Sequence, residues 1–211
     1  MKITKFGHCC LLVEEGGLRI LTDPGVYSSA QNEIKNIDLV LITHEHQDHL
    51  HVDSLKIVLK NNPEAKVITN TAVSKILEKE GIAFTILEDG QSLTESGVLF
   101  EGFGKLHALM HPLLTPVQNT GYFIASRLFY PGDALTNPGK KVEILALPVA
   151  GPWLKFSEAV DYTLELKPKT CFSVHDGILK DTGLAERLAG PIFEKDGIKM
   201  VTLELGSAKD F

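Results

Sequence analysis

The sequence has few cysteines and no long apolar run, and both absences narrow the class of protein. There are 3 cysteines among 211 residues, the adjacent pair Cys9 and Cys10 and the distant Cys171. This odd number makes no disulfide framework, so we expect small core thiols in a reducing compartment, while a thiol near a functional site stays possible. No run approaches the roughly 18 apolar residues of a membrane span, and residues 1–7 contain no apolar signal-peptide region. We therefore expect a cytoplasmic protein with no membrane partner.

An excess of basic residues is also missing. The 27 acidic and 21 basic residues give a formal net charge of -6, so the surface offers no broad positive field for DNA, RNA or anionic lipid. We expect no nucleic-acid partner. No linker, low-complexity tract or charge block divides the chain, and 44% of its residues are hydrophobic, which is ample for a core. The prediction is one domain over residues 1–211.

Hydrophobic periodicity predicts strands and helices in two similar halves. Short apolar or alternating runs predict strands at Lys2–Phe6, Cys9–Glu14, Leu18–Thr22, Leu39–Ile42, Lys66–Thr69, Ala83–Leu87, Val98–Phe103, Leu106–Met110, Gly121–Ala125, Arg127–Tyr130, Glu143–Leu147, Thr170–Val174 and Lys199–Leu205. Helical spacing predicts helices after an N-cap at Asp53 or Ser54, around Val73–Leu77 with Gly81 closing, after an N-cap at Ser157, and at Leu184–Phe193. Two β-rich halves, each followed by helices, predict an α/β (α+β) fold, a four-layer αββα sandwich.

The most informative stretch is Thr43–His49, which directly follows the buried strand expected at Leu39–Ile42. A rigid strand end lets the side chains that follow it point into a crevice. His44 and His46 lie two residues apart and can face one ion together, whereas Asp48 and His49 can reach a second position nearby. Imidazole and carboxylate are ligands that suit zinc and related divalent ions. The alternative interpretation is a solvated polar loop or a cluster that faces nucleic acid.

More candidate ligands follow apolar runs elsewhere in the chain. His107, Asp133 and His175 each come at or near the end of an expected strand, where a sheet would deliver them to a common edge. Taken singly, His107 could be a core histidine, Asp133 a turn residue and His175 a residue at the start of a helix. Asp23 ends another strand, where it either caps a turn or accepts the N–H of a ligating imidazole. His8 lies between two strands, as either a turn residue or a site residue.

Together these residues resemble the metallo-β-lactamase superfamily, and more closely its branch of predicted metal-dependent hydrolases that includes the ascorbate-6-phosphate lactonases. The resemblance spans His8 to His175 and implies an αββα sandwich with its site where the two sheets meet. It also implies a division of the metal ligands. His44, His46 and His107 surround one ion, Asp48, His49 and His175 surround the other, and Asp133 bridges them. His111, four residues after His107, is the alternative third imidazole of the first group.

Such a site holds two divalent ions, for which Zn²⁺ is the first expectation and Mn²⁺ or iron are alternatives. Its chemistry is hydrolysis of an ester, lactone or phosphodiester bond in a small molecule by a hydroxide that the ions generate. Asp48 is expected to orient that hydroxide, and the proton for the leaving group comes from water, Asp48 or His8. The alternatives are an iron or manganese oxidoreductase and a non-catalytic protein that metal stabilises. A homo-oligomer is possible.

Overall fold

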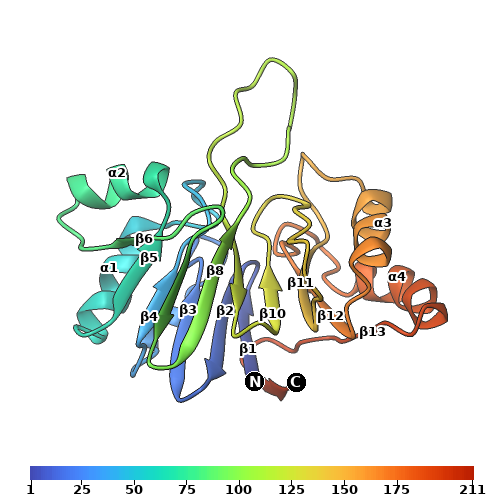
Figure 1. Ribbon diagram of the computed structural model, residues 1–211, viewed down its shortest axis with the longest axis horizontal. Coiled ribbons are helices and arrows are strands. Elements are labelled where there is room, and N and C mark those ends of the chain that lie inside the picture. Colours follow the sequence, from blue (N-terminus) through green and yellow to red (C-terminus); the bar gives the residue numbers. More distant parts are fainter.

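The computed structural model describes all residues, 1–211, and arranges them in four layers (Figure 1). The first sheet has the spatial order β14 (Ala208–Asp210), β1 (Lys2–Gly7), β2 (Cys10–Glu15), β3 (Leu18–Thr22), β4 (Leu39–Leu41), β5 (Lys66–Thr69) and β6 (Thr85–Ile86). The second sheet has the order β13 (Lys199–Met200), β12 (Thr170–Val174), β11 (Ile144–Pro148), β10 (Leu128–Tyr130), β9 (Gly121–Ile124), β8 (Val98–Phe103) and β7 (Ser92–Glu95). The expected αββα sandwich is confirmed.

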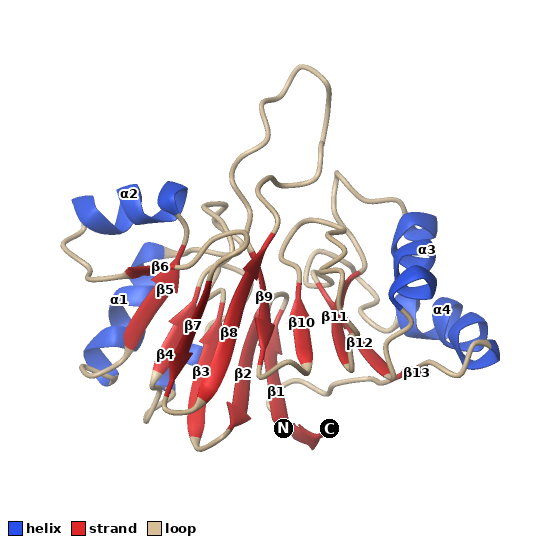
Figure 2. Ribbon diagram, viewed as in Figure 1, coloured by secondary structure: helices blue, strands red, loops and turns tan.

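Both sheets are built in the same way. Each begins with an antiparallel meander, β1–β2–β3 in the first and β7–β8–β9–β10 in the second, and continues with parallel strands. The parallel strands are joined by the helices α1 (Val52–Asn61) and α2 (Thr71–Lys79), or α3 (Phe156–Leu166) and α4 (Leu184–Lys195). A parallel crossover commonly runs through such a helix, although the connections β3–β4 and β10–β11 contain no α-helix. Figure 2 shows these helices on the two outer sides, with the strands between them.

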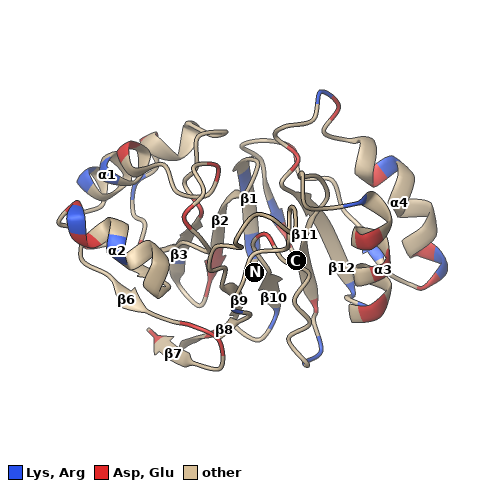
Figure 3. Cartoon of the chain, turned by 90° about the horizontal axis from the view of Figure 1, so that it is seen from above, with Lys and Arg blue, Asp and Glu red and all other residues tan.

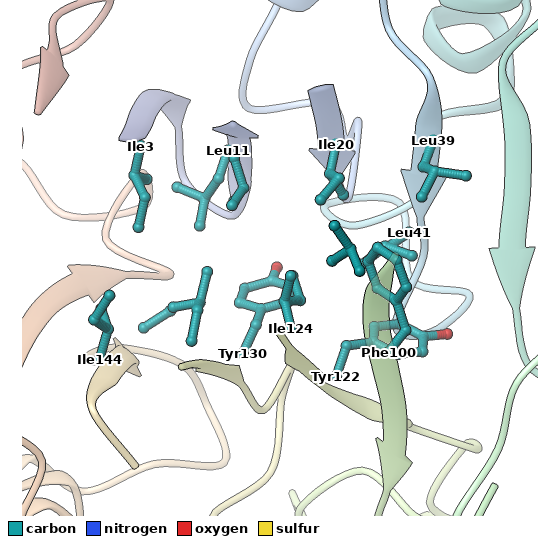
Figure 4. Packing of buried hydrophobic residues seen from close by; sticks show 14 of the residues in the cluster. Ile3, Leu11, Ile20, Leu39, Leu41, Phe100, Tyr122, Ile124, Tyr130 and Ile144 are labelled. Atoms are coloured by element: carbon teal, nitrogen blue, oxygen red, sulfur yellow. The ribbon is translucent and has the colours of Figure 1, made fainter. Parts of the chain in front are cut away.

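Three apolar clusters hold the layers together. The largest, with 20 buried residues, fills the space between the sheets, where Ile20 and Leu39 of the first sheet face Phe100 and Tyr122 of the second (Figure 4). One further cluster packs α1 and α2 on the first sheet, and the other packs α3 and α4 on the second. Acidic and basic residues are interspersed on the outward faces of these helices (Figure 3). No helix combines the length and apolar character that crossing a membrane requires.

Several predicted elements are wrong in detail. Leu106–Met110 is not a strand but part of the loop 104–120, because Leu106 and Leu109 are exposed and find no apolar surface to cover. The strand expected at Lys199–Leu205 stops at Met200, after which the chain crosses to the first sheet with Leu203 packed against the core. The edge strands β7 and β14 were not predicted. Half-buried and exposed side chains alternate in β7, and all three side chains of β14 are exposed. Neither strand therefore forms an apolar run in the sequence.

Two predicted helix caps are also wrong. The N-cap of α1 is His51 rather than Asp53 or Ser54, and its Nδ1 lies 3.0 Å from Ser54 Oγ. The N-cap of α3 is Lys155, while Ser157 lies inside the first turn. Glu158 accepts a hydrogen bond from the Lys155 backbone N–H at 2.9 Å and so caps the helix from within.

Stability should depend on the contact between the sheets. We expect Phe100→Ala to lower the free energy of unfolding by about 3–5 kcal/mol, because it leaves a cavity in a fully buried place. Leu205→Ala, at a side chain that is 66% exposed, is the control and should change it by no more than about 0.5 kcal/mol. Urea unfolding followed by circular dichroism measures both; equal effects would contradict this assignment of the core.

Candidate metal centre

All the candidate residues gather at one edge of the sandwich. The strands β1, β3 and β4 run in one direction in the first sheet, as do β8, β10 and β12 in the second. The chain leaves the carboxyl ends of these strands at the edge where the sheets meet, and the candidate side chains follow there. Carboxyl ends of strands commonly carry ligand sites, because the loops beyond them are free to vary on a rigid support.

The side chains form two groups that share one carboxylate. In the first, the ligand atoms of His44, His46, His107 and Asp133 lie within 4.8 Å of one another. In the second, those of Asp48, His49, Asp133 and His175 do so as well. The structure thus brings together every residue for which a metal role was predicted, in the predicted division. His46 and Asp48 are half-buried and the others are buried, so the cluster opens to solvent beside these two residues.

Asp133 lies between the two groups of imidazoles. Its Oδ2 is 3.2 Å from His107 Nε2 and 2.9 Å from His175 Nε2, and its Oδ1 is 3.0 Å from His49 Nε2. Asp133 follows a turn at Gly132, whose φ of +65° suits glycine, and a Cβ there would meet Asn119 Oδ1 at 2.4 Å. The same Asn119 Oδ1 accepts the Asp133 backbone N–H at 3.0 Å. This bond fixes the backbone of the residue whose carboxylate the two groups share.

Hydrogen bonds fix the tautomers of three imidazoles. Asp23 accepts from His49 Nδ1 at 2.7 Å, and the Ala108 carbonyl accepts from His107 Nδ1 at 2.6 Å. Thr43 Oγ1 donates to Asp23 and can therefore accept from His44 Nδ1, which lies 3.0 Å away. When such a ring carries a single proton, its Nε2 lone pair points towards the cluster, as a metal ligand requires. Asp23 makes the contact that was weighed for it in the sequence.

The remaining nitrogen atoms of the cluster lack ordinary partners. His175 Nδ1 is buried without a hydrogen bond, and the Nε2 atoms of His49 and His175 meet the Asp133 carboxylate at 3.0 and 2.9 Å rather than a neutral acceptor. His44 Nε2 and His46 Nδ1 lie only 3.1 Å apart, which places two imidazole nitrogens against each other. Buried polar atoms without partners are costly. Divalent cations among these lone pairs would satisfy them, so the donor set fits the predicted ions.

The charges of the cluster are balanced within it. The pKa of Asp133 is held well below its usual range by His49, His107 and His175 in spite of burial, and that of Asp48 is also lowered. Burial favours neutral imidazole in His175, but the neighbouring Cys9, Asp133 and Asp48 outweigh it and raise its pKa to about 10. For His49, Asp133 likewise outweighs burial and raises the pKa. In the metal-free protein, protonated His49 and His175 therefore supply the positive charge that balances the carboxylates of Asp133 and Asp48.

His8 is hydrogen-bonded to the Asp48 carboxylate. The Gly177 backbone N–H donates to His8 Nδ1 at 3.1 Å, so the ring proton is on Nε2, which lies 3.2 Å from Asp48 Oδ2 and donates to it. Burial lowers the pKa of His8 and keeps it neutral near pH 7. His8 thus holds the carboxylate, and its ring also contacts Tyr27 at a centroid distance of 5.0 Å.

His111, the alternative third imidazole, lies outside the cluster, whereas Trp153 contacts it. His111 lies in the exposed part of the loop 104–120, where its Nδ1 accepts the Leu113 N–H at 3.1 Å, outside both groups. Of the two histidines, His107 alone is in the cluster. Trp153 donates its indole N–H to Asp133 Oδ2 at 2.9 Å, a contact that was not predicted. The signal for this contact was present, because a buried indole N–H usually needs an acceptor and Trp153 follows a strand end.

Fold and donor set together define a metallohydrolase-type αββα sandwich, and comparison with known proteins agrees. The profile of the Beta-lactamase superfamily domain matches residues 2–175, and the chain belongs to this superfamily. It is 36% identical to Protein Rv0786c of Mycobacterium tuberculosis over 85% of each chain, and 28% identical to a UPF0173 metal-dependent hydrolase of Flavobacterium johnsoniae over 71% of this chain and 72% of the other. Among solved structures, Igni18, a metallo hydrolase of Ignicoccus hospitalis, matches with a TM-score of 0.78 at 22% identity, over 100% of this chain and 98% of that one.

The contact between Asp23 and His49 offers a first test of the site. We expect Asp23→Asn to keep the fold but weaken metal binding by about 10- to 100-fold, because an amide supports the ligating imidazole less well than a carboxylate. Asp38→Asn is the matched control, since Asp38 Oδ2 accepts only the exposed Arg19 N–H, at 2.7 Å, on the same sheet. Competition titration with a chromophoric chelator measures both; equal affinities would contradict the supporting role of Asp23.

The raised pKa of His175 offers a second test. Its imidazole is protonated below about pH 10 in the metal-free protein, whereas a ligand must be neutral. Binding of an ion should therefore release protons at pH 7–8, and the affinity should rise with pH up to about 10. Calorimetry in two buffers of different ionisation enthalpy measures the protons released. Identical heats in both buffers would show that the ring is already neutral.

Proposed function

We propose that this protein is a metal-dependent hydrolase with a two-ion centre, most suited to zinc, that cleaves an ester, lactone or phosphodiester bond of a small molecule. The observation that carries the proposal is the sharing of Asp133 by two groups of ligands. His44, His46 and His107 would hold one ion, and Asp48, His49 and His175 the other. Family membership and the names of the relatives support hydrolysis, while the ascorbate-6-phosphate lactonase branch stays a prediction from the sequence.

When bound, such an ion pair supplies a hydroxide at neutral pH and positive charge for the oxygen on which negative charge develops. The side chains of the protein do the positioning. Asp48 faces the open side of the cluster and, with its lowered pKa, is ionised at neutral pH, so it can orient a water molecule. His8 holds Asp48 through its Nε2–H and is a positioning residue. An ionised Asp48 and a neutral His8 are poor acids, so we assign protonation of the leaving group to solvent.

Imidazole and carboxylate ligands also accept manganese and iron, so the metal itself must be measured. The experiment is elemental analysis of the purified protein together with hydrolysis of nitrophenyl esters, lactones and bis-aryl phosphates. Activity should be lost on chelation and return with zinc. Iron with oxygen uptake would favour an oxidoreductase instead. Full stability after chelation and no hydrolysis in the panel would contradict every metal-centred function.

Variants test the residues of this proposal. His46→Ala and Asp133→Ala should both lower metal content and reduce hydrolysis by more than about 100-fold, since even residues that only support ligands contribute 10- to 100-fold. His111→Ala should leave both quantities unchanged, because this histidine lies in the same loop as His107 but outside the cluster. Unchanged metal content in both His46→Ala and Asp133→Ala would overturn the assignment of ligands.

A further inference from the structure

A cysteine lies directly behind the second group of ligands. The ligand atoms of His8, Cys9, His49 and His175 lie within 4.8 Å of one another, and all four side chains are buried. Atoms that share one zinc ion at about 2.0–2.3 Å lie less than about 4.6 Å apart, so small side-chain rotations would bring this set onto a single ion. Three imidazoles and one thiolate make a complete tetrahedral set, whereas the group that contains Asp48 and Asp133 opens to solvent.

The side chains of Cys9 and Cys10 lie on opposite sides of the first sheet. Cys9 belongs to the cluster between the sheets, while Cys10 faces α1 and α2 on the other side of the first sheet. Cys9 lies in the turn between β1 and β2, whereas Cys10 is the first residue of β2. The backbone of Cys9 is fixed, because its carbonyl accepts from Thr22 Oγ1 at 2.9 Å. The thiol is therefore held beside the histidines.

A second observation points to a ligand at this place. His175 Nδ1 has no hydrogen-bond partner, and the Nε2 atoms of His49 and His175 face carboxylates, although the two side chains are 0% and 3% exposed. Both residues belong to the open group and to the set with Cys9. His49 has a single free ring nitrogen, Nε2, because its Nδ1 donates to Asp23 at 2.7 Å, so it can serve an ion on one side only. The two positions therefore exclude each other.

We propose that Cys9 is a metal ligand, and that a thiophilic divalent ion such as cadmium, cobalt or zinc binds at a closed site formed by His8, Cys9, His49 and His175. The inference rests on the proposed metal centre and concerns an alternative place for its second ion. On binding, the Cys9 S–H bond breaks, its proton passes to the buffer and a sulfur–metal bond forms without oxidation or reduction. Occupancy would remove His8 from Asp48 and empty the open position.

The test is the absorption spectrum of the cobalt-loaded protein. A thiolate ligand gives a sulfur-to-cobalt charge-transfer band in the near ultraviolet, which nitrogen and oxygen ligands do not. We expect this band in the native protein and its loss in Cys9→Ser, while Cys10→Ser and Cys171→Ser keep it. Those two thiols are buried as well but lie outside every group of candidate ligands, so they are matched controls. Cys9→Ala replaces Cys9→Ser if the serine variant does not fold.

Affinity provides an independent measurement. Cys9→Ser should weaken cadmium binding and leave manganese binding unchanged, because manganese prefers oxygen ligands. Two bound cobalt ions and hydrolysis without the band would overturn the role of Cys9 and leave the proposed function standing. The band in the native protein, with no hydrolysis by zinc-loaded Cys9→Ser, in which the open position can fill, would support Cys9 and contradict the hydrolase. A protein that binds no cobalt would overturn both.

Discussion

A buried carboxylate, Asp23, joins the two sheets at the edge where the histidines gather. Its Oδ2 accepts from Thr43 Oγ1, His49 Nδ1 and, at 2.5 Å, the hydroxyl of Tyr130, and its Oδ1 accepts the Thr43 N–H. Tyr130 belongs to the second sheet, and the other residues belong to the first. A carboxyl group without solvent contact is tolerated only where such donors surround it. Asp23 thus connects the second sheet to the orientation of a candidate ligand on the first.

Gly25, two residues after Asp23, allows the turn after β3 to pack closely against the loop that carries the histidines. A Cβ on Gly25 would lie 1.8 Å from the carbonyl oxygen of Asp48, so only glycine lets the turn after β3 pack against the loop that carries the histidines. The Val26 N–H donates to the Gln47 carbonyl at 2.9 Å across the same contact. The turn that follows Asp23 therefore supports the histidine loop through its backbone. Because these contacts are made by the backbone, no side-chain pattern in the sequence indicates that this turn supports the histidine loop.

Much of the fold was predictable from the sequence because its strands are short, apolar and buried. The runs at Leu18–Thr22, Val98–Phe103 and Thr170–Val174 are strands with the expected bounds, and the placement of candidate ligands after strands carried the prediction of the site. Part of the loop 104–120 was wrongly predicted as a strand, because alternation alone does not show whether an apolar side chain meets a core. Trp153 and Cys9 were undervalued, since their relevance lies in contacts across sheets that no local pattern encodes.

Both groups of candidate ligands draw on the two halves of the chain. His44, His46, Asp48 and His49 come from the first sheet and its loops, whereas His107, Asp133 and His175 come from the second. Neither half can offer a complete set by itself. An ion bound here would therefore act as a reversible cross-link whose strength is coupled to the docking of the sheets: anything that loosens the interface weakens ion binding, and each bound ion adds to the stability of the interface by mass action.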